Sequence, residues 1–255
     1  MLHCSEHILF KNFVAVRNKG WIETKRKGST GVGYTLETLL SIPENSFAIP
    51  DFNGIEVKAM RVFSKKRIHL FNAEPDGDYL YPQDRIINTI GYPCKKNPKY
   101  KVFMSAAYGN EYTNLGYSKK LKIYVNWDSE KVEFLVTDRY YNNVKIDISW
   151  SFALLKSKLD TKIRKLALIY ALNKFENEKE YFYYNWIEFY ENKGFDTFLH
   201  LIEDGTIKIC FKIGVYTEGI KTGKIDNHGT DFSIKEEDLE KLFTKINIFK
   251  KQIDI

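Results

Sequence analysis

The sequence predicts a mixed α/β protein, and three observations support that fold class. Residues 121–126 and 132–138 alternate between apolar and polar side chains and are joined by a short polar turn, which predicts a β-hairpin. Residues 151–174 carry apolar side chains at helical spacing over several turns, which predicts a helix. The 17 tyrosines and 18 phenylalanines favour strands elsewhere in the chain.

Length and composition narrow the class of protein. The 255 residues suffice for one large domain or for two lobes that share a core, and the 44% of apolar residues predicts a folded chain. Three widely separated cysteines have neither zinc spacing nor the pattern of a disulfide framework, which fits a reducing compartment. Because no signal-peptide pattern and no membrane-spanning apolar run is evident, we expect a cytoplasmic protein without membrane association.

The charge is mildly basic. A net charge of +6, from 39 basic and 33 acidic residues, fits a nucleic-acid partner without requiring one. The basic residues form short runs that would equally suit a solvated surface. These runs are Lys25-Arg26-Lys27, Lys65-Lys66-Arg67, Lys95-Lys96 and Lys119-Lys120.

Within the first sixty residues we expect a helix, a glycine-rich loop, a second helix and a strand, in that order. Residues 1–22 have roughly helical apolar spacing. The basic loop at 23–33 could present backbone N–H groups to phosphate, although it lacks the Gly-Lys-Ser/Thr of a P-loop; alternatively, it only leads into the next helix. That helix is expected over 35–42. A strand is expected over 52–60, entered through a turn at Asn53-Gly54.

The remaining chain is less regular up to residue 118. Within 63–118, the short apolar pieces 86–87 and 102–104 are candidate strands. Asp76-Gly77-Asp78 predicts a turn, because the rest of a calcium-binding EF-hand loop is missing. The later expected elements are a strand over 144–148, strands over 180–186 and 207–216, a helix over 195–203, a polar loop over 217–232 and a helix over 236–245.

Asp51, Glu56 and Lys58 are the strongest candidates for a chemical site. Glu56 and Lys58 lie two apart on an expected strand, so both point to one face, and Asp51 can reach the same point. Mg²⁺ binds through one or two carboxylates with phosphate and water, and a lysine beside it can stabilise the developing charge. Glu37 offers a further carboxylate. The same spacing also fits an ordinary Glu/Lys pair on a surface strand, because it occurs by chance in about one such sequence in ten.

Several blocks of the sequence carry a resemblance to a known family. They are WIETKRKGSTGVGYTLETLLSIPENSFAIPDFNGIEVK (21–58), ISWSF (148–152), KEYFYYN (179–185), EDGTIKICFKIGVYTEG (203–219) and KIDNHGTDF (224–232). In this order they resemble the MvaI/BcnI group of restriction endonucleases, which are relatives of the mismatch-repair nickase MutH. The resemblance covers most of the chain except residues 63–118.

The resemblance implies a PD-(D/E)xK core, with a mixed central sheet flanked by helices, in a two-lobed DNA clamp. It implies a catalytic lobe over 1–150, including the variable insertion, and a recognition lobe over 151–255, with interleaving of the two left open. It implies Mg²⁺-dependent hydrolysis of double-stranded DNA, with Mn²⁺ as a possible substitute. It further implies a bacterial or archaeal monomer that nicks each strand in turn. A cognate DNA methyltransferase would be a functional, not a physical, partner.

Family motifs also suggest roles for individual residues. By matching position, Asp51 and Glu56 would be metal ligands and Lys58 the catalytic lysine. Glu37 matches a helix carboxylate near the metals, and His228 matches the histidine of a His-Gly-Thr-x-Phe loop, where an ordinary polar contact is equally open. The candidate DNA-binding residues are Lys27, Ser29, Thr30, Cys210, Lys212, Tyr216, Lys221, Lys224, Asp226, Asn227, His228 and Ser233.

Three departures from the family pattern concern target choice. Relatives that cut CCNGG carry aspartate and arginine where this chain has Cys210 and Lys212, and another arginine where it has Ser233. Arginine makes bidentate contacts to guanine and aspartate accepts from cytosine. We therefore expect a different recognition sequence. Ser233 also has capping-box spacing to Glu236, which predicts a helix cap.

Two alternatives use the same sequence features. A MutH-like repair nickase would share the site but depend on a partner for activation. A DNA-binding module without catalysis is disfavoured by the complete set of Asp51, Glu56 and Lys58.

Overall fold

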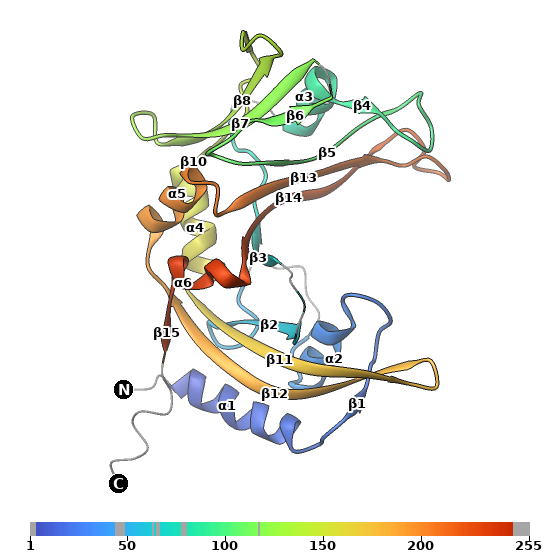
Figure 1. Cartoon of the computed structure of the whole chain (residues 1–255), viewed down its shortest axis with the longest axis vertical. Helices are drawn as coiled ribbons and strands as arrows, with labels where there is room; N and C mark the ends of the chain where they lie inside the picture. Colours follow the sequence, from blue (N-terminus) through green and yellow to red (C-terminus); the bar gives the residue numbers. More distant parts are fainter. Residues whose placement is uncertain are drawn as a thin grey trace. The chain divides into compact units, whose positions relative to one another are not determined.

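The computed structural model in Figure 1 describes residues 4–43, 49–62, 64, 67–77, 81–116 and 118–246. The chain forms two compact units. Unit 1 comprises residues 1–66, 160–193 and 243–255, and unit 2 comprises residues 67–159 and 194–242. Each unit assembles its sheets from separate segments of the chain. The two units are interleaved in sequence.

Unit 1 is built on a mixed sheet with five strands among the described residues. The order is β1–β12–β11–β2, and β15 also pairs with β12. Strand β2 is parallel to β11, whereas the other pairings are antiparallel, which confirms the expected mixed sheet. The strands are β1 (Ile22–Glu23), β2 (Glu56–Arg61), β11 (Lys165–Glu176), β12 (Lys179–Asn192) and β15 (Phe243–Ile246).

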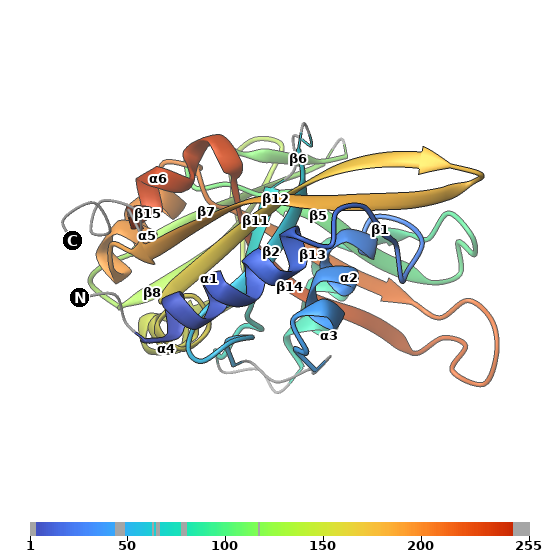
Figure 2. The ribbon, with the colours of Figure 1, turned by 90° about the horizontal axis from the view of Figure 1, so that it is seen from below.

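Helices α1 (Cys4–Arg17) and α2 (Gly31–Leu39) contribute to the core of unit 1. Figures 1 and 2 show α1 running along the face of the sheet formed by β11 and β12. Phe13 of α1 and Leu36 of α2 are buried in one hydrophobic cluster with Val57 of β2. Because successive residues of a strand point to opposite faces, Glu56 and Lys58 project away from the face that carries Val57.

The helix expected over 151–174 is correct only in its first half. Helix α4 (Phe152–Lys162) ends at Lys162, and the following residues form β11, which lies between β12 and β2. The residues Leu166–Ile169 are all buried, so both faces of this strand are covered. An unbroken apolar run is compatible with a buried helix or a buried strand, and here the two neighbouring strands decide between them.

Unit 2 contains two sheets that pack through aromatic side chains. In the described residues, one sheet has the order β10–β8–β7–β6 with β9 paired to β8, and the other has the order β3–β14–β13–β5–β4. Phe134 of the first sheet and Phe211 of the second have ring centroids 4.9 Å apart. Trp150 contacts both Phe211 and Phe232, so the core lies between the sheets.

The strands of unit 2 are β3 (Arg67–Asn72), β4 (Tyr92–Pro93), β5 (Lys101–Ala107), β6 (Thr113–Leu115), β7 (Lys119–Asn126), β8 (Lys131–Asp138), β9 (Asn143–Val144), β10 (Ser149–Ser151), β13 (Lys208–Val215) and β14 (Ile225–Lys235). Its helices include α3 (Pro82–Ile90), α5 (Phe195–Glu203), the 3-10 helix η1 (Glu236–Asp238) and α6 (Leu239–Leu242), together with most of α4. None of the helices in the described part of the chain has the length and apolar character needed to cross a bilayer.

Several sequence predictions are confirmed in unit 2. The hairpin is formed by β7 and β8, the helix at 195–203 is α5, and the strand at 102–104 lies within β5. The strand expected at 86–87 is wrong, because these residues lie in α3, where Pro82 starts the helix and Ile86, Ile87 and Ile90 are buried. The turn predicted at Asp76-Gly77-Asp78 lies partly outside the described residues, and within them Oδ1 of Asp76 accepts a hydrogen bond from the Ser151 amide.

Other boundaries shift by a few residues. Helix α1 ends at Arg17, and α2 begins at Gly31, so two glycines of the expected loop are helical. Strands β2, β12 and β13 confirm the strands expected over 52–60, 180–186 and 207–216, whereas only Val144 of the expected 144–148 strand lies in a strand.

The C-terminal part of the chain differs most from expectation. The expected loop 217–232 becomes strand from Ile225 onward, because β14 pairs with both β13 and β3. Ser233 therefore lies in the middle of a sheet, opposite Lys208, and the predicted helix cap is wrong. Only η1 and α6 are helical in the segment expected as a helix over 236–245, and the chain then continues as β15.

Candidate active site

A tight turn brings Asp51 back onto strand β2. Phe52 and Ile55 exchange backbone hydrogen bonds of 2.9 and 2.8 Å around Asn53-Gly54. Both turn residues have positive φ, 44° and 84°, as the turn requires, and Asn-Gly tolerates this conformation. The Val57 amide then donates a 3.0 Å hydrogen bond to Oδ2 of Asp51. Because β2 is an edge strand of its sheet, this amide is open to a side-chain acceptor.

Glu56 and Lys58 lie beside each other on β2, as their spacing predicts. The Lys58 ammonium is 2.5 Å from Oε1 of Glu56. The Glu56 side chain is 1% exposed, whereas that of Lys58 is 28% exposed. The carboxylate is thus enclosed by protein while the lysine reaches the surface of the site.

Lys162 is a further member of this cluster that the sequence does not reveal. Its ammonium lies 2.7 Å from Oε2 of Glu56 and 3.8 Å from Oδ1 of Asp51, and it donates a 2.7 Å hydrogen bond to the Ile49 carbonyl. Within the expected helix 151–174, Lys162 is one of several lysines on an outer face. Its only sequence signal is its place at the helix end, which becomes visible once that helix is known to stop there.

Burial has the largest effect on the pKa of Glu56 in this cluster. Burial raises the pKa of Glu56, and the negative charge of Asp51 adds to this, although Lys58 and Lys162 oppose it. Oε2 of Glu56 is buried and contacts the ammonium of Lys162 at 2.7 Å. Two ammonium groups therefore balance two carboxylates. An enclosed carboxylate next to a second carboxylate offers the hard oxygen ligands that suit a divalent cation.

The carboxylates that the cluster offers to a cation are those of Asp51 and Glu56. No group of three or more histidine, cysteine, aspartate or glutamate side chains suited to a metal occurs in the described ranges. Glu37 accordingly does not complete such a group with Asp51 and Glu56. It lies in α2 and lines a groove of about 360 Å³ with Tyr34 and Thr38. Mg²⁺ would take its remaining ligands from water and phosphate, as it does in most proteins.

The predicted phosphate-binding loop lies between β1 and α2. Lys27, Ser29 and Thr30 are all exposed there. The backbone carbonyls of Gly28 and Ser29 accept hydrogen bonds from Arg61 at the end of β2. The loop and the carboxylate strand are therefore joined within unit 1.

The predicted DNA-reading residues lie in unit 2, and several of them meet in the β13–β14 hairpin. Nε2 of His228 is 3.2 Å from Oδ2 of Asp226. A hydrogen bond from the Tyr216 hydroxyl to Asp226 raises the pKa of Tyr216. The Lys221 ammonium lies 5.3 Å from the centre of the Tyr216 ring. Lys224 and Asn227 belong to the same hairpin, and Asn227 donates to Glu74 at 3.2 Å.

Cys210 and Lys212 project from one face of β13, and Asp231 of β14 lies opposite Cys210. The Lys212 ammonium is 3.9 Å from Oδ2 of Asp231, and Asp231 is also paired with Nδ1 of His69. Ser233 differs from the other candidates because it is buried, and its carbonyl accepts a 2.7 Å hydrogen bond from Arg67.

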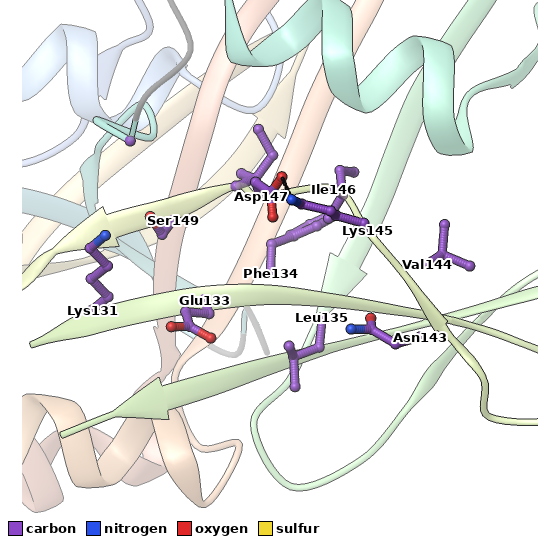
Figure 3. A pocket seen from close by; sticks show the side chains of 12 residues that line it. Lys131, Glu133, Phe134, Leu135, Asn143, Val144, Lys145, Ile146, Asp147 and Ser149 are labelled. Atoms are coloured by element: carbon purple, nitrogen blue, oxygen red, sulfur yellow. Dashed lines mark ion pairs between the residues drawn. The ribbon is translucent and has the colours of Figure 1, made fainter. Parts of the chain in front are cut away.

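A separate cavity of about 580 Å³ lies in unit 2, beside the sheet that contains β8, β9 and β10 (Figure 3). It is bounded by β8 and the segment that leads from β9 to β10, and it contains none of the predicted site residues. In its wall, Asp147 lies 3.6 Å from the Lys145 ammonium and 3.3 Å from the guanidinium of the neighbouring Arg85. This cavity is unrelated to the carboxylate cluster of unit 1.

Comparison with known proteins identifies the family. The model of the MvaI/BcnI restriction endonuclease family matches residues 10–243. The structure is similar to that of restriction endonuclease MvaI with its cognate DNA substrate, with 33% identity, a TM-score of 0.84, and coverage of 94% of this chain and 96% of that chain. It is also similar to MvaI in the absence of DNA, with 31% identity, a TM-score of 0.65, and coverage of 96% and 98%. No curated protein sequence matches the chain.

The match extends over nearly the whole chain and both units. It includes the Asp51 turn, strand β2 and the β13–β14 hairpin. The chain belongs to the MvaI/BcnI restriction endonuclease family and is accordingly a site-specific deoxyribonuclease.

Proposed function

We propose that this endonuclease is a Type II enzyme that hydrolyses double-stranded DNA with Mg²⁺ at the Asp51–Glu56–Lys58 cluster. The observation that carries the proposal is the enclosed Glu56 carboxylate, which lies between two lysines and next to Asp51. Burying charged groups carries a desolvation cost, and such clusters of perturbed groups are typical of functional sites. The similarity to MvaI bound to its cognate DNA supports duplex DNA as the substrate.

Each residue of the cluster has a distinct role in this proposal. Asp51 and Glu56 would hold the ion, which supplies charge neutralisation at the phosphate and an activated water. The Val57 amide fixes Oδ2 of Asp51, so the carboxylate is oriented before the ion arrives. Lys58, which is anchored on Glu56 and partly exposed, places a positive charge where the phosphate gains negative charge.

DNA contacts would be divided between the two units. Lys27, Ser29 and Thr30 of the loop before α2 would contact the backbone, since they are exposed and the loop is basic. Cys210, Lys212 and the hairpin residues from Tyr216 to His228 would read bases. Glu37 and His228 are proposed to support catalysis from α2 and from the hairpin, respectively. Ser233 would act indirectly, because it is buried against Arg67.

Plasmid cleavage by the purified chain tests the proposal. With Mg²⁺ or Mn²⁺, supercoiled plasmid should convert first to nicked circles and then to linear DNA, because a monomer with one active site cuts the strands in turn. EDTA should stop both steps. Glu56→Gln should abolish cleavage, whereas Glu178→Gln, an exposed residue at the tip of the β11–β12 hairpin, should cut normally.

Other outcomes would indicate the alternative functions. Nicked circles that never become linear, or activity only after a partner protein is added, would indicate a repair nickase. Binding without cleavage under all metal conditions would indicate a DNA-binding module. A monomeric mass in solution, and a DNA methyltransferase gene beside the gene of this enzyme, are the further results expected of a restriction enzyme.

A further inference from the structure

Arg61, the last residue of β2, makes an unusually complete set of hydrogen bonds. Its Nε and Nη2 donate to the two carboxylate oxygens of Glu180, both at 2.8 Å. Its Nη1 donates to the Ser29 carbonyl at 3.1 Å, and Nη2 also donates to the Gly28 carbonyl at 3.0 Å. The Arg61 and Glu180 side chains are 14% and 9% exposed. A planar guanidinium can make these bonds together, whereas a lysine ammonium cannot.

Glu180 extends this network to the other strands of unit 1. Oε1 of Glu180 accepts a 3.0 Å hydrogen bond from Asn173 of β11, and the Glu180 carbonyl accepts one of 2.8 Å from the Thr24 amide. The basic loop 24–30 is therefore held at its start by Glu180 and near its end by Arg61. Both residues lie on the sheet that carries Glu56 and Lys58.

The loop also makes contacts of its own: the Thr24 hydroxyl donates a 2.7 Å hydrogen bond to the Arg26 carbonyl, and the Arg26 guanidinium lies 3.7 Å from the centre of the Tyr34 ring. It carries three consecutive cations, Lys25, Arg26 and Lys27, whose mutual repulsion opposes a compact arrangement. Gly28 has a φ of +87°, and the Arg61 bonds fix the two carbonyls that follow this point. The Lys25 amide also donates to Thr35 of α2 at 2.9 Å, which holds the first part of the loop.

We propose that Arg61 is a positioning residue that fixes the basic loop 24–30 relative to the metal-binding strand. The loop, and a cation that Asp51 and Glu56 would hold, then engage phosphates of one duplex without further ordering of the loop. Fixing a binding loop in advance lowers the entropic cost of association. The inference rests on the proposed function in that its ligand is duplex DNA.

The test uses Arg61→Lys, which keeps the charge and its pairing with Glu180 but removes the bonds to the loop carbonyls. Arg17→Lys, at the exposed end of α1, is the matched control. Hydrogen exchange is measured on the free protein without metal. Affinity for a mixed-sequence duplex is measured by fluorescence anisotropy in EDTA over a range of salt concentrations.

In Arg61→Lys we expect faster exchange confined to residues 24–30 and an affinity about tenfold lower. The slope of log affinity against log salt should be unchanged, because the number of cations is unchanged. Single-turnover cleavage at saturating DNA should stay within about threefold of wild type, because the change weakens binding rather than chemistry. Arg17→Lys should match wild type throughout.

Four results would overturn the proposal. They are unchanged loop exchange, faster exchange throughout β2 and β11, loop exchange that rises with no loss of affinity, and a reduced salt slope, which would mean that the affinity is lost through fewer phosphate contacts rather than through loop ordering. If Arg61→Lys does not fold, Arg61→Gln/Glu180→Gln replaces it, because this pair removes both enclosed charges together. The exchange measurement needs neither DNA nor cleavage, so it remains decisive if the enzyme shows no nuclease activity.

Discussion

The ammonium of Lys58 lies 2.5 Å from Oε1 of Glu56, and the opposite carboxylate oxygen, Oε2, is 2.7 Å from the ammonium of Lys162. One carboxylate is therefore shared by two lysines of different origin. Lys58 comes from the same strand, whereas Lys162 comes from the end of α4. Lys58 is partly exposed and Lys162 is also close to Asp51, which suggests different roles for the two lysines.

Replacement of Lys58 should remove chemistry without removing metal binding. We expect Lys58→Met to lower the single-turnover cleavage rate by about a hundredfold or more, since a positive charge at the reacting phosphate is lost. Mn²⁺ affinity, measured by electron paramagnetic resonance, should not fall, because neither carboxylate is altered. Weakened Mn²⁺ binding together with an unchanged rate would assign Lys58 to the structure of the site instead.

Replacement of Lys162 should change metal affinity and leave cleavage intact, unlike replacement of Lys58. Lys162 competes with an incoming cation for Glu56 and Asp51, so Lys162→Met should bind Mn²⁺ about tenfold more tightly, a difference of about 1.4 kcal/mol. Cleavage should persist. Lys156→Met, an exposed residue of the same helix, is the control and should bind Mn²⁺ like wild type. Looser Mn²⁺ binding by Lys162→Met would show that this lysine organises the carboxylates rather than competing for them.

Asp231 should make stability depend on pH in acid. Burial would raise its pKa, but the hydrogen bond and charge of His69, with Lys212 and Lys208, outweigh this and lower the pKa below the ordinary value for aspartate. The stabilisation is therefore complete above the unfolded pKa of about 3.9 and is lost as the pH falls through the lower folded pKa. Asp231→Asn should lower the free energy of unfolding by about 2 kcal/mol at pH 5.

Urea unfolding of wild type and Asp231→Asn at pH 5 and at pH 3 measures this dependence. The difference between the two proteins should shrink at the lower pH. A difference that grows as the pH falls would mean that the carboxyl group is not stabilised in its charged form.

Target choice should differ from that of the CCNGG enzymes. Lys212 lies near Asp231 on the exposed face of β13. A lysine at this position makes a less specific contact to guanine than the bidentate contact of an arginine. Lys212→Ala should relax discrimination at one base pair, by about 1–3 kcal/mol. Mapping the ends produced on a panel of plasmids gives both the target of wild type and the change in the variant. Cleavage confined to CCNGG sites would contradict this expectation.

The sequence predicts the local parts of the site well. Asp51, Glu56 and Lys58 lie within a few residues of one another, so a turn and a strand suffice to bring them together. The Asn53-Gly54 turn is a strong local signal, and its prediction is confirmed. Similarly, the β7–β8 hairpin and α5 depend on periodicity within short segments, and both are confirmed.

Features that depend on distant partners could not be predicted in this way. Lys162 joins the site because α4 ends there, and α4 ends because the next apolar run becomes β11 between two other strands. The spacing of Ser233 to Glu236 predicts a helix cap, but Ser233 lies within β14, which pairs with a strand on each side. In both cases, strands from distant segments of the chain determine the local structure. A local sequence pattern carries no information about these pairing partners.

Asp51 and Glu56 are proposed to form the catalytic metal site. Asp51→Asn tests this proposal most directly, because an asparagine oxygen can still accept the Val57 hydrogen bond while the charge is removed. In Mg²⁺, we predict that this variant folds like wild type and that its single-turnover rate on duplex DNA falls by about a thousandfold or more. A folded Asp51→Asn protein that cuts DNA as fast as wild type would contradict the account.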